Sequence, residues 1–254
     1  MASLNETLYN IFTKDTVNEE EIDDLLRKGA NINYKLNGIS LLYSVCYNQN
    51  VTNVKMLIDK GANVNIQNYL GSTPLHVACM DFNVNIVNIL IENGANINIQ
   101  NNEGQAPLHY THGNYKLSNI LIENGANVDI QTNTGLTPLM QAVYWDHYAT
   151  TKLLLENGAN LQLRNNMGRT VFNIALDYNR TKIFEILTEW PSIISEWRDK
   201  LTLEQRCWIS CIQNNIDTKD KIPNYIIQQL ERWLNETKSP LPIVNHIRRL
   251  FYKN

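Results

Sequence analysis

The sequence predicts an all-α fold of the solenoid class, in which units of two helices and a hairpin stack in one row. A Gly-Ala pair recurs through the chain, and a second glycine recurs with the same period. An apolar segment that begins with Thr-Pro-Leu or a variant of it follows the second glycine in the middle units. Self-similarity with a period of about 20 to 50 residues is the signature of stacked repeats.

The two glycines define the length of the unit, which is roughly 33 residues. Both series shorten at the same place, between Gly94 and Gly125 and between Gly104 and Gly135. Because two independent markers stay in step, chance is a poor explanation. The third unit is two residues short within 112–115, so we expect its turn between helices to differ. The markers are Gly29, Gly61, Gly94, Gly125 and Gly158, and then Gly38, Gly71, Gly104, Gly135 and Gly168.

Each unit carries signals for the start and end of its helices. Thr73 before Pro74 predicts a helix start, with the threonine as cap and the proline at the first helical position. The glycine of the Gly-Ala pair suits the end of the second helix, where a positive φ is needed. The asparagine-rich segment 96–104 suits a tight hairpin. One unit cannot bury its own apolar face, but stacked neighbours form a continuous core.

The markers divide the chain into three parts. Residues 1–34 read as a truncated first unit that caps the stack, and residues 35–190 hold the repeats. The last of these, from residue 164, is degenerate, with Thr170-Val171-Phe172 in place of Thr-Pro-Leu. Residues 191–254 form a separate helical segment, because the repeat pattern stops at about residue 191.

The period and the motifs resemble the ankyrin repeat. The second unit reads Thr73-Pro74-Leu75-His76, the third reads Ala106-Pro107-Leu108-His109, and each is followed by a Gly-Ala-Asn link. The resemblance implies that the two imidazoles are structural hydrogen-bonding groups between repeats. It also implies a concave surface, made by hairpin tips and inner-helix ends, that holds a partner protein.

The resemblance assigns the partner-binding positions one by one. Five of them are tyrosine or tryptophan, residues that are enriched at the energetic centres of protein interfaces. The alternative is that some of these rings pack only against neighbouring hairpins. The candidate partner-binding residues are Tyr47, Tyr69, Leu70, Met80, Asp81, Tyr144, Trp145, Met167, Arg169 and Tyr178.

Composition and motifs argue against several other functions. The formal net charge is −3, with 22 basic and 25 acidic residues, which is too balanced for a nucleic-acid-binding protein. No apolar run is long enough for a membrane span, and residues 1–12 do not read as a secretory signal. We therefore expect a cytoplasmic or nuclear protein with four free cysteines. No phosphate loop, catalytic motif or metal-ligand spacing is present, so we expect no cofactor, no metal and no enzymatic activity.

The segment after residue 190 is expected to form helices at Ser192–Lys200, Leu203–Asn214 and Asn224–Asn235. Thr202-Leu203-x-x-x-Cys207-x-x-x-Cys211 resembles the elongin-binding box of SOCS-box proteins, although Cys211 stands where that box has an aliphatic residue. The segment from Leu241-Pro242 resembles the cullin-selecting box, with Val244 in place of its second proline.

Ankyrin repeats followed by such a box resemble the ankyrin-repeat and SOCS-box family. This implies a substrate-recognition subunit of an elongin–cullin–RING ubiquitin ligase, with elongin B/C and a cullin as partners. Ile222-Pro223 and the apolar residues after it resemble instead the start of an F-box, which would bind a Skp-type adaptor. A third interpretation is a plain ankyrin scaffold or inhibitor with a helical end cap.

Overall fold

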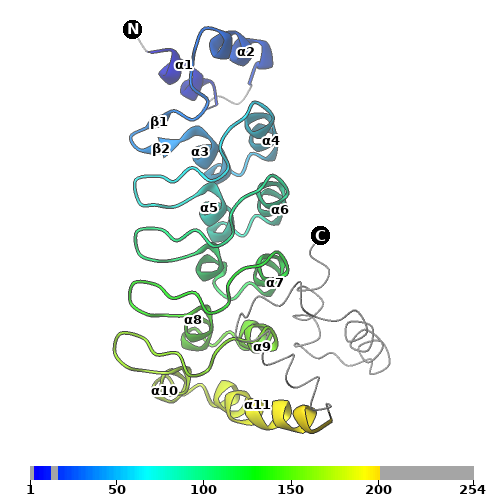
Figure 1. Cartoon of the computed structure of the whole chain (residues 1–254). Coiled ribbons are helices and arrows are strands. Elements are labelled where there is room, and N and C mark those ends of the chain that lie inside the picture. The colour runs from blue at the N-terminus through cyan, green and yellow to red at the C-terminus, as the bar shows by residue number, and fades with distance from the viewer. Residues whose placement is uncertain (1–2, 13–16, 201–254) are drawn as a thin grey trace, which may run out of the picture.

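The structure is a computed structural model that describes residues 3–12 and 17–200 of the 254-residue chain. Its helix pairs stack in one row, and the hairpins between successive pairs project to one side (Figure 1). The expected all-α solenoid is therefore confirmed. The elements are α1 (Leu4–Ile11), α2 (Glu19–Arg27), β1 (Lys35–Leu36), β2 (Ile39–Ser40), α3 (Leu41–Tyr47), α4 (Val51–Asp59), α5 (Pro74–Met80), α6 (Val84–Glu92), the 3₁₀ helix η1 (Pro107–Thr111), α7 (Tyr115–Glu123), α8 (Pro138–Tyr144), α9 (Tyr148–Glu156), α10 (Val171–Asp177) and α11 (Thr181–Lys200).

The helices form two layers. The inner helices α3, α5, η1, α8 and α10 lie next to the hairpins, and the outer helices α4, α6, α7 and α9 lie behind them (Figure 1). Leucines at corresponding positions of the units are buried between the layers. Leu75 of α5, Leu90 of α6 and Leu121 of α7 each have 0% exposed surface. Burying one such side chain contributes about 1.5–3 kcal/mol, so the stack is held mainly by this continuous apolar seam.

The expected helix signals lie where the sequence predicts them. Thr137 precedes Pro138 at the start of α8, and its hydroxyl oxygen accepts the backbone N–H of Met140 at 3.1 Å. The outer helix α7 begins after Asn114, whose side-chain oxygen accepts the N–H of Leu117 at 3.1 Å. The glycines of the Gly-Ala pairs all have positive φ just after an outer helix. Each unit thus terminates its own helices with local hydrogen bonds.

The hairpins are joined to one another by backbone hydrogen bonds. The first hairpin is an antiparallel pair of strands, with Lys35 opposite Ser40, and the later ones follow the same path in Figure 1. Asn102 donates its backbone N–H to the carbonyl of Leu70 at 2.9 Å, and Asn133 donates to Glu103 at 2.9 Å. Gly104 has φ +74°, and a Cβ there would lie 2.5 Å from the backbone nitrogen of Asn133. Glycine is required because the hairpins approach this closely.

The third unit accommodates its missing residues in the inner helix, not only in the following turn. Its inner helix is the short 3₁₀ helix η1, whereas the corresponding helices are α-helices of seven residues. His112 (φ +42°) and Gly113 (φ +77°) then turn the chain into α7. Thr111 closes this end by donating its hydroxyl to the carbonyl of Leu108 at 3.0 Å. The unit therefore lacks the last turn that carries Met80 in the unit before it.

The stack ends in a helix that is longer than expected. The helix predicted to begin at Ser192 is the second half of α11, which starts at Thr181 and passes through Pro191. The expected boundary between repeats and tail at residue 190 therefore falls inside one helix. Trp190, which the sequence groups with the tail tryptophans, is 9% exposed and belongs to the repeat core. The first predicted tail helix is thus continuous with the second helix of the last repeat.

Candidate protein-binding face

The candidate partner-binding residues lie on one side of the stack, which we call the hairpin face. It consists of the hairpin tips and of the C-terminal ends of the inner helices with the turns that follow them. Tyr47, Met80 and Tyr144 are the last residues of α3, α5 and α8. Asp81, Trp145 and Tyr178 are the capping residues that follow α5, α8 and α10. These positions recur because each inner helix ends at the same point of its unit.

The structure brings three of the predicted aromatic residues together in the fourth and fifth repeats. The ring centre of Tyr144 lies 4.8 Å from that of Trp145 and 4.5 Å from that of Tyr178, with both pairs edge to face. Trp145 is 57% exposed and Tyr178 is 42% exposed. A hydrogen bond between the side chains of Tyr144 and Tyr178 raises the pKa of Tyr178. The cluster is therefore a rigid aromatic surface that still faces solvent.

Two arginines frame this aromatic cluster. Arg169 pairs with Asp177 at 2.7 Å. Arg180 donates to the carbonyl oxygen of Tyr144 at 2.7 Å and lies 3.8 Å from Asp146. Exposed ion pairs contribute only about 0–1 kcal/mol to stability. Their main effect here is to hold the turns that carry the aromatic rings.

The candidates of the first three repeats are exposed but do not form an aromatic cluster with the others. Tyr47 is 59% exposed and Tyr69 is 62% exposed, and Leu70 beside Tyr69 is 51% exposed. Asp81 is half-buried, and burial raises the pKa of its carboxyl. Its Oδ2 atom is buried without a hydrogen bond among the described residues.

Met167, at the fifth hairpin, is the most exposed of the candidates at 81%.

The two motif histidines connect successive repeats, as expected from the resemblance. The Nδ1 atom of His76 accepts the backbone N–H of Thr73 at 3.1 Å, so its Nε2 carries the proton and donates to the carbonyl of Gln105 at 3.0 Å. His109 makes the same connection to the carbonyl of Leu136 at 3.3 Å. Burial lowers the pKa of His76 to about 4 and also lowers that of His109. Both imidazoles are neutral structural groups.

Two of the four cysteines lie within the described residues. Cys46 and Cys79 are free and buried, and burial raises the pKa of both thiols. In residues 3–12 and 17–200 no group of three or more His, Cys, Asp or Glu side chains is placed to hold a metal ion. No helix in the same ranges has the length and apolar character needed to cross a membrane.

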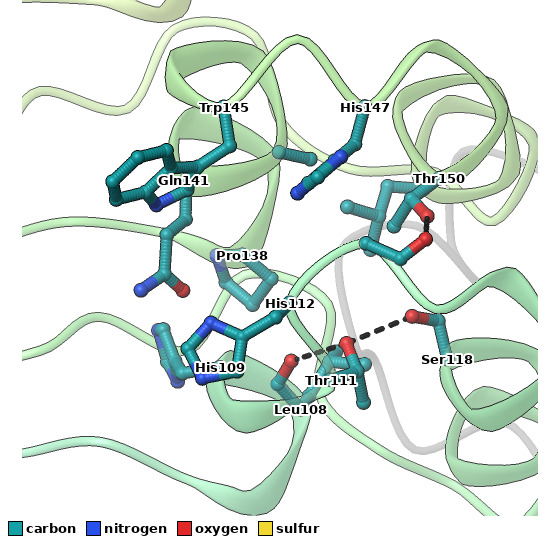
Figure 2. A pocket seen from close by; sticks show the side chains of 13 residues that line it. Leu108, His109, Thr111, His112, Ser118, Pro138, Gln141, Trp145, His147 and Thr150 are labelled. Carbon is teal, nitrogen blue, oxygen red and sulfur yellow. Dashed lines mark hydrogen bonds between the residues drawn. The ribbon is translucent and has the colours of Figure 1, made fainter. Parts of the chain in front are cut away.

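A recess on the hairpin face was not foreseen as a site. It lies between the third and fourth repeats, beside Trp145, and has a volume of about 20 Å³ (Figure 2). His112 and Gly113 border it from the third repeat, and Gln141 and His147 from the fourth. We name it the third-repeat recess. The signal that leads to it is the two-residue deletion, because the shortened turn at His112 and Gly113 borders the recess.

The candidates of the tail lie outside the described residues. These are Leu203, Cys207 and Cys211 of the elongin-binding resemblance, and Leu241 and Pro242 of the cullin-selecting resemblance. Their proposed role rests on the sequence.

The fold and the hairpin face define a helical repeat protein of the protein-binding class. The family model described as ankyrin repeats (three copies) matches residues 14–101, 41–132, 82–165 and 108–194 in overlapping segments. Together these matches extend from residue 14 to residue 194, which is well over half of the chain. The chain therefore belongs to the ankyrin-repeat family and is a protein–protein interaction module. A search of curated proteins returned no match.

Proposed function

We propose that the chain is the substrate-recognition subunit of an elongin–cullin–RING ubiquitin ligase. In this proposal the hairpin face holds the substrate protein, and the segment after residue 200 binds elongin B/C and a cullin. The observation that carries the substrate-binding half is the exposed cluster of Tyr144, Trp145 and Tyr178 on a rigid frame. Such a ligase subunit acts in the cytoplasm or the nucleus.

The aromatic cluster supports partner binding because the fold does not need its exposed surface. Rings that only stabilise a repeat are buried, whereas Trp145 keeps 57% of its surface exposed. A partner that covers Trp145 and Tyr178 removes apolar area from water, which contributes about 25 cal/mol per Å². The edge-to-face contacts already hold the rings, so little conformational entropy is lost on binding.

The ligase half rests on the sequence after Lys200. Leu203, Cys207 and Cys211 recur every four residues, a spacing that places them on one side of the helix predicted there. Such an apolar stripe suits an adaptor groove that accepts a helix. Cys211 is compatible with an aliphatic position because a free cysteine behaves as a small apolar residue.

The test is a pulldown of purified elongin B/C with the full chain. Wild type captures the adaptor, and a double change of Leu203→Asp with Cys207→Asp abolishes capture. The matched control is Gln205→Asp, which adds a charge to the same predicted helix away from the stripe and leaves capture intact. Trp145→Ala, on the hairpin face, also leaves capture intact because Trp145 is not part of the proposed adaptor-binding motif.

Two results contradict the ligase proposal. Capture that survives the double change shows that the stripe is not the adaptor site, and absence of capture by wild type excludes the elongin role. Binding of a Skp-type adaptor that requires Pro223 and Ile226 indicates the F-box interpretation instead. A chain that binds neither adaptor is an ankyrin scaffold or inhibitor.

A further inference from the structure

The third-repeat recess exists because of a change in the repeat itself. Pro74 and Pro107, which begin successive inner helices, keep the usual period, but Asn83 and Asn114, which cap the outer helices that follow, lie closer together in the sequence. The missing residues correspond to the last turn of an inner helix. The backbone closes the gap at Gly113, where a Cβ would overlap the ring of His147. The recess is therefore built by tight packing around a deletion.

Hydrogen-bond donors surround the recess without partners. Figure 2 shows the side chains of His112, Gln141, Trp145 and His147 around one common space. Within the described residues the side chains of His112, Gln141 and Trp145 make no hydrogen bond. An indole can only donate, and a glutamine amide and an imidazole each present an N–H. The hydrogen-bonding groups of the recess that have no partner within the described residues are therefore mainly donors.

The remaining polar groups of the recess are already engaged. Thr150 donates its hydroxyl to the carbonyl of Gly113 at 2.9 Å, and Ser118 donates to the hydroxyl of Thr111 at 2.9 Å. The buried His109 bonds to the carbonyl of Leu136. These bonds hold the walls, so the donors of His112, Gln141 and Trp145 are free to meet a ligand.

The described lining of the recess contains no acidic group that would oppose an anionic ligand. Histidines are the titratable lining groups, and no acidic residue is among the described lining residues. The carboxylate of Asp146 favours the charged form of His147. Arg180 lies 3.8 Å from that carboxylate and offsets its charge. A hydrogen-bond acceptor is therefore complementary to the N–H groups of the recess, whereas a lysine or arginine head brings only further donors.

We propose that the third-repeat recess binds the side-chain carboxylate of an aspartate or glutamate on the partner protein. The inference rests on the proposed binding of a partner by the hairpin face, but not on the ligase role. A volume of about 20 Å³ accepts one group of the size of a water molecule, which matches one carboxylate oxygen. Trp145 borders both the recess and the aromatic cluster, so one partner segment contacts both.

The proposal implies a pH dependence through His147. Burial and the neighbouring His112 lower the pKa of His147, while Asp146 opposes that shift. The other titratable and charged groups around it are His109 and Arg180. A bound carboxylate favours the imidazolium and raises the pKa of His147. By linkage, the carboxylate then binds more tightly as the pH falls through that pKa.

The experiment follows the histidine ring signals of the full chain by NMR. The probes are N-acetylglutamate N-methylamide and its glutamine analogue, titrated at millimolar concentration between pH 6 and pH 8. The carboxylate probe is expected to shift the His112 and His147 signals in a saturable way. Its affinity should be several-fold higher at pH 6 than at pH 8, and the glutamine analogue should produce no saturable shift.

Variants separate the recess from the rest of the face. Gln141→Ala is expected to weaken carboxylate binding several-fold, because it removes a donor whose side chain has no bond within the fold. Gln162→Ala, which changes an exposed glutamine outside the recess and outside the candidate partner-binding residues, is the matched control and should leave probe binding unchanged. Equal shifts with both probes, no saturable shift, or undiminished binding by Gln141→Ala overturns the proposal. Each of these results leaves elongin capture, and therefore the ligase role, to be judged by its own experiment.

Discussion

The Nε2 atom of His76 lies 3.0 Å from the carbonyl oxygen of Gln105, which belongs to the next repeat. A neutral imidazole is required for the second bond of this ring, in which Nδ1 accepts the backbone N–H of Thr73. The side chain is 1% exposed, so charging it means burying an ion and losing the hydrogen bond from Thr73. This relationship makes the stack sensitive to acid.

We expect the stability of the stack to fall as the pH drops. The folded-state pKa of His76 is about 4, below its ordinary value of 6.5, so the unfolded chain binds more protons between these values. Neutral His76 therefore contributes about 3 kcal/mol to the free energy of unfolding above pH 6.5, and this contribution is lost as the pH falls towards 4. Urea unfolding at pH 7.5, 6, 5 and 4.5 measures it. His76→Gln, although less stable at pH 7.5, should show a clearly smaller pH slope, and an unchanged slope would assign the effect to other groups.

The apolar seam should be the main source of stability. Leu121→Ala in α7 removes a side chain with 0% exposure and is expected to cost about 2–5 kcal/mol. Leu70→Ala at a hairpin tip removes the same side chain where it is 51% exposed, and should change stability by about 0.5 kcal/mol or less. Thermal and urea unfolding of both variants check the difference. Equal losses would refute the assignment of Leu121 to the core.

Two glycines with positive φ should respond differently to alanine. Gly104→Ala places a Cβ 2.5 Å from the backbone nitrogen of Asn133, whereas Gly94→Ala meets nothing within 4 Å. We expect about 1 kcal/mol of backbone strain at Gly94 and at least about 1 kcal/mol more at Gly104, because the hairpins must move apart. Urea unfolding of the two variants gives the comparison. A loss at Gly104 no larger than that at Gly94 would mean that the hairpins separate easily.

Trp145 should contribute little to folding. Its ring is 57% exposed and contacts Tyr144 edge to face, so Trp145→Ala should cost about 0.5–1.5 kcal/mol of stability. Thermal unfolding measures this cost, and circular dichroism checks that the helices are retained. Val143→Ala, at a neighbouring position of α8 but 0% exposed, is the matched buried control and should cost about as much or more. A loss at Trp145 well above that at Val143 would show that the indole is a structural residue.

Much of the fold follows from the local sequence. Glycine spacing, Thr137-Pro138 and the Gly-Ala pairs predict the helix starts and ends because capping and positive φ are properties of a few neighbouring residues. The buried role of His76 was also predictable, although only through the ankyrin resemblance. The continuation of α11 through residues 191–200 was not visible in the sequence, because the length of that helix does not depend on where the repeat motif ends.

The candidate site was predictable only in part. The exposed positions of Tyr144, Trp145 and Tyr178 follow from their place in the repeat, but their mutual contacts do not. The deletion in the third unit was visible as a shortened spacing between its glycine markers, and a changed turn was expected from it. The 3₁₀ helix and the third-repeat recess were not, because they depend on how His147 packs against Gly113.

The sequence by itself determined the repeat, its family and the positions that lie on the hairpin face, since a periodic pattern encodes contacts that are local or lie one unit away. Only the tertiary structure decided which of these positions act together. Ring contacts such as that of Tyr144 with Tyr178 depend on the distance between neighbouring units, and so does the opening beside Trp145. That distance is set by the packing of whole helices, which no motif of a few residues contains.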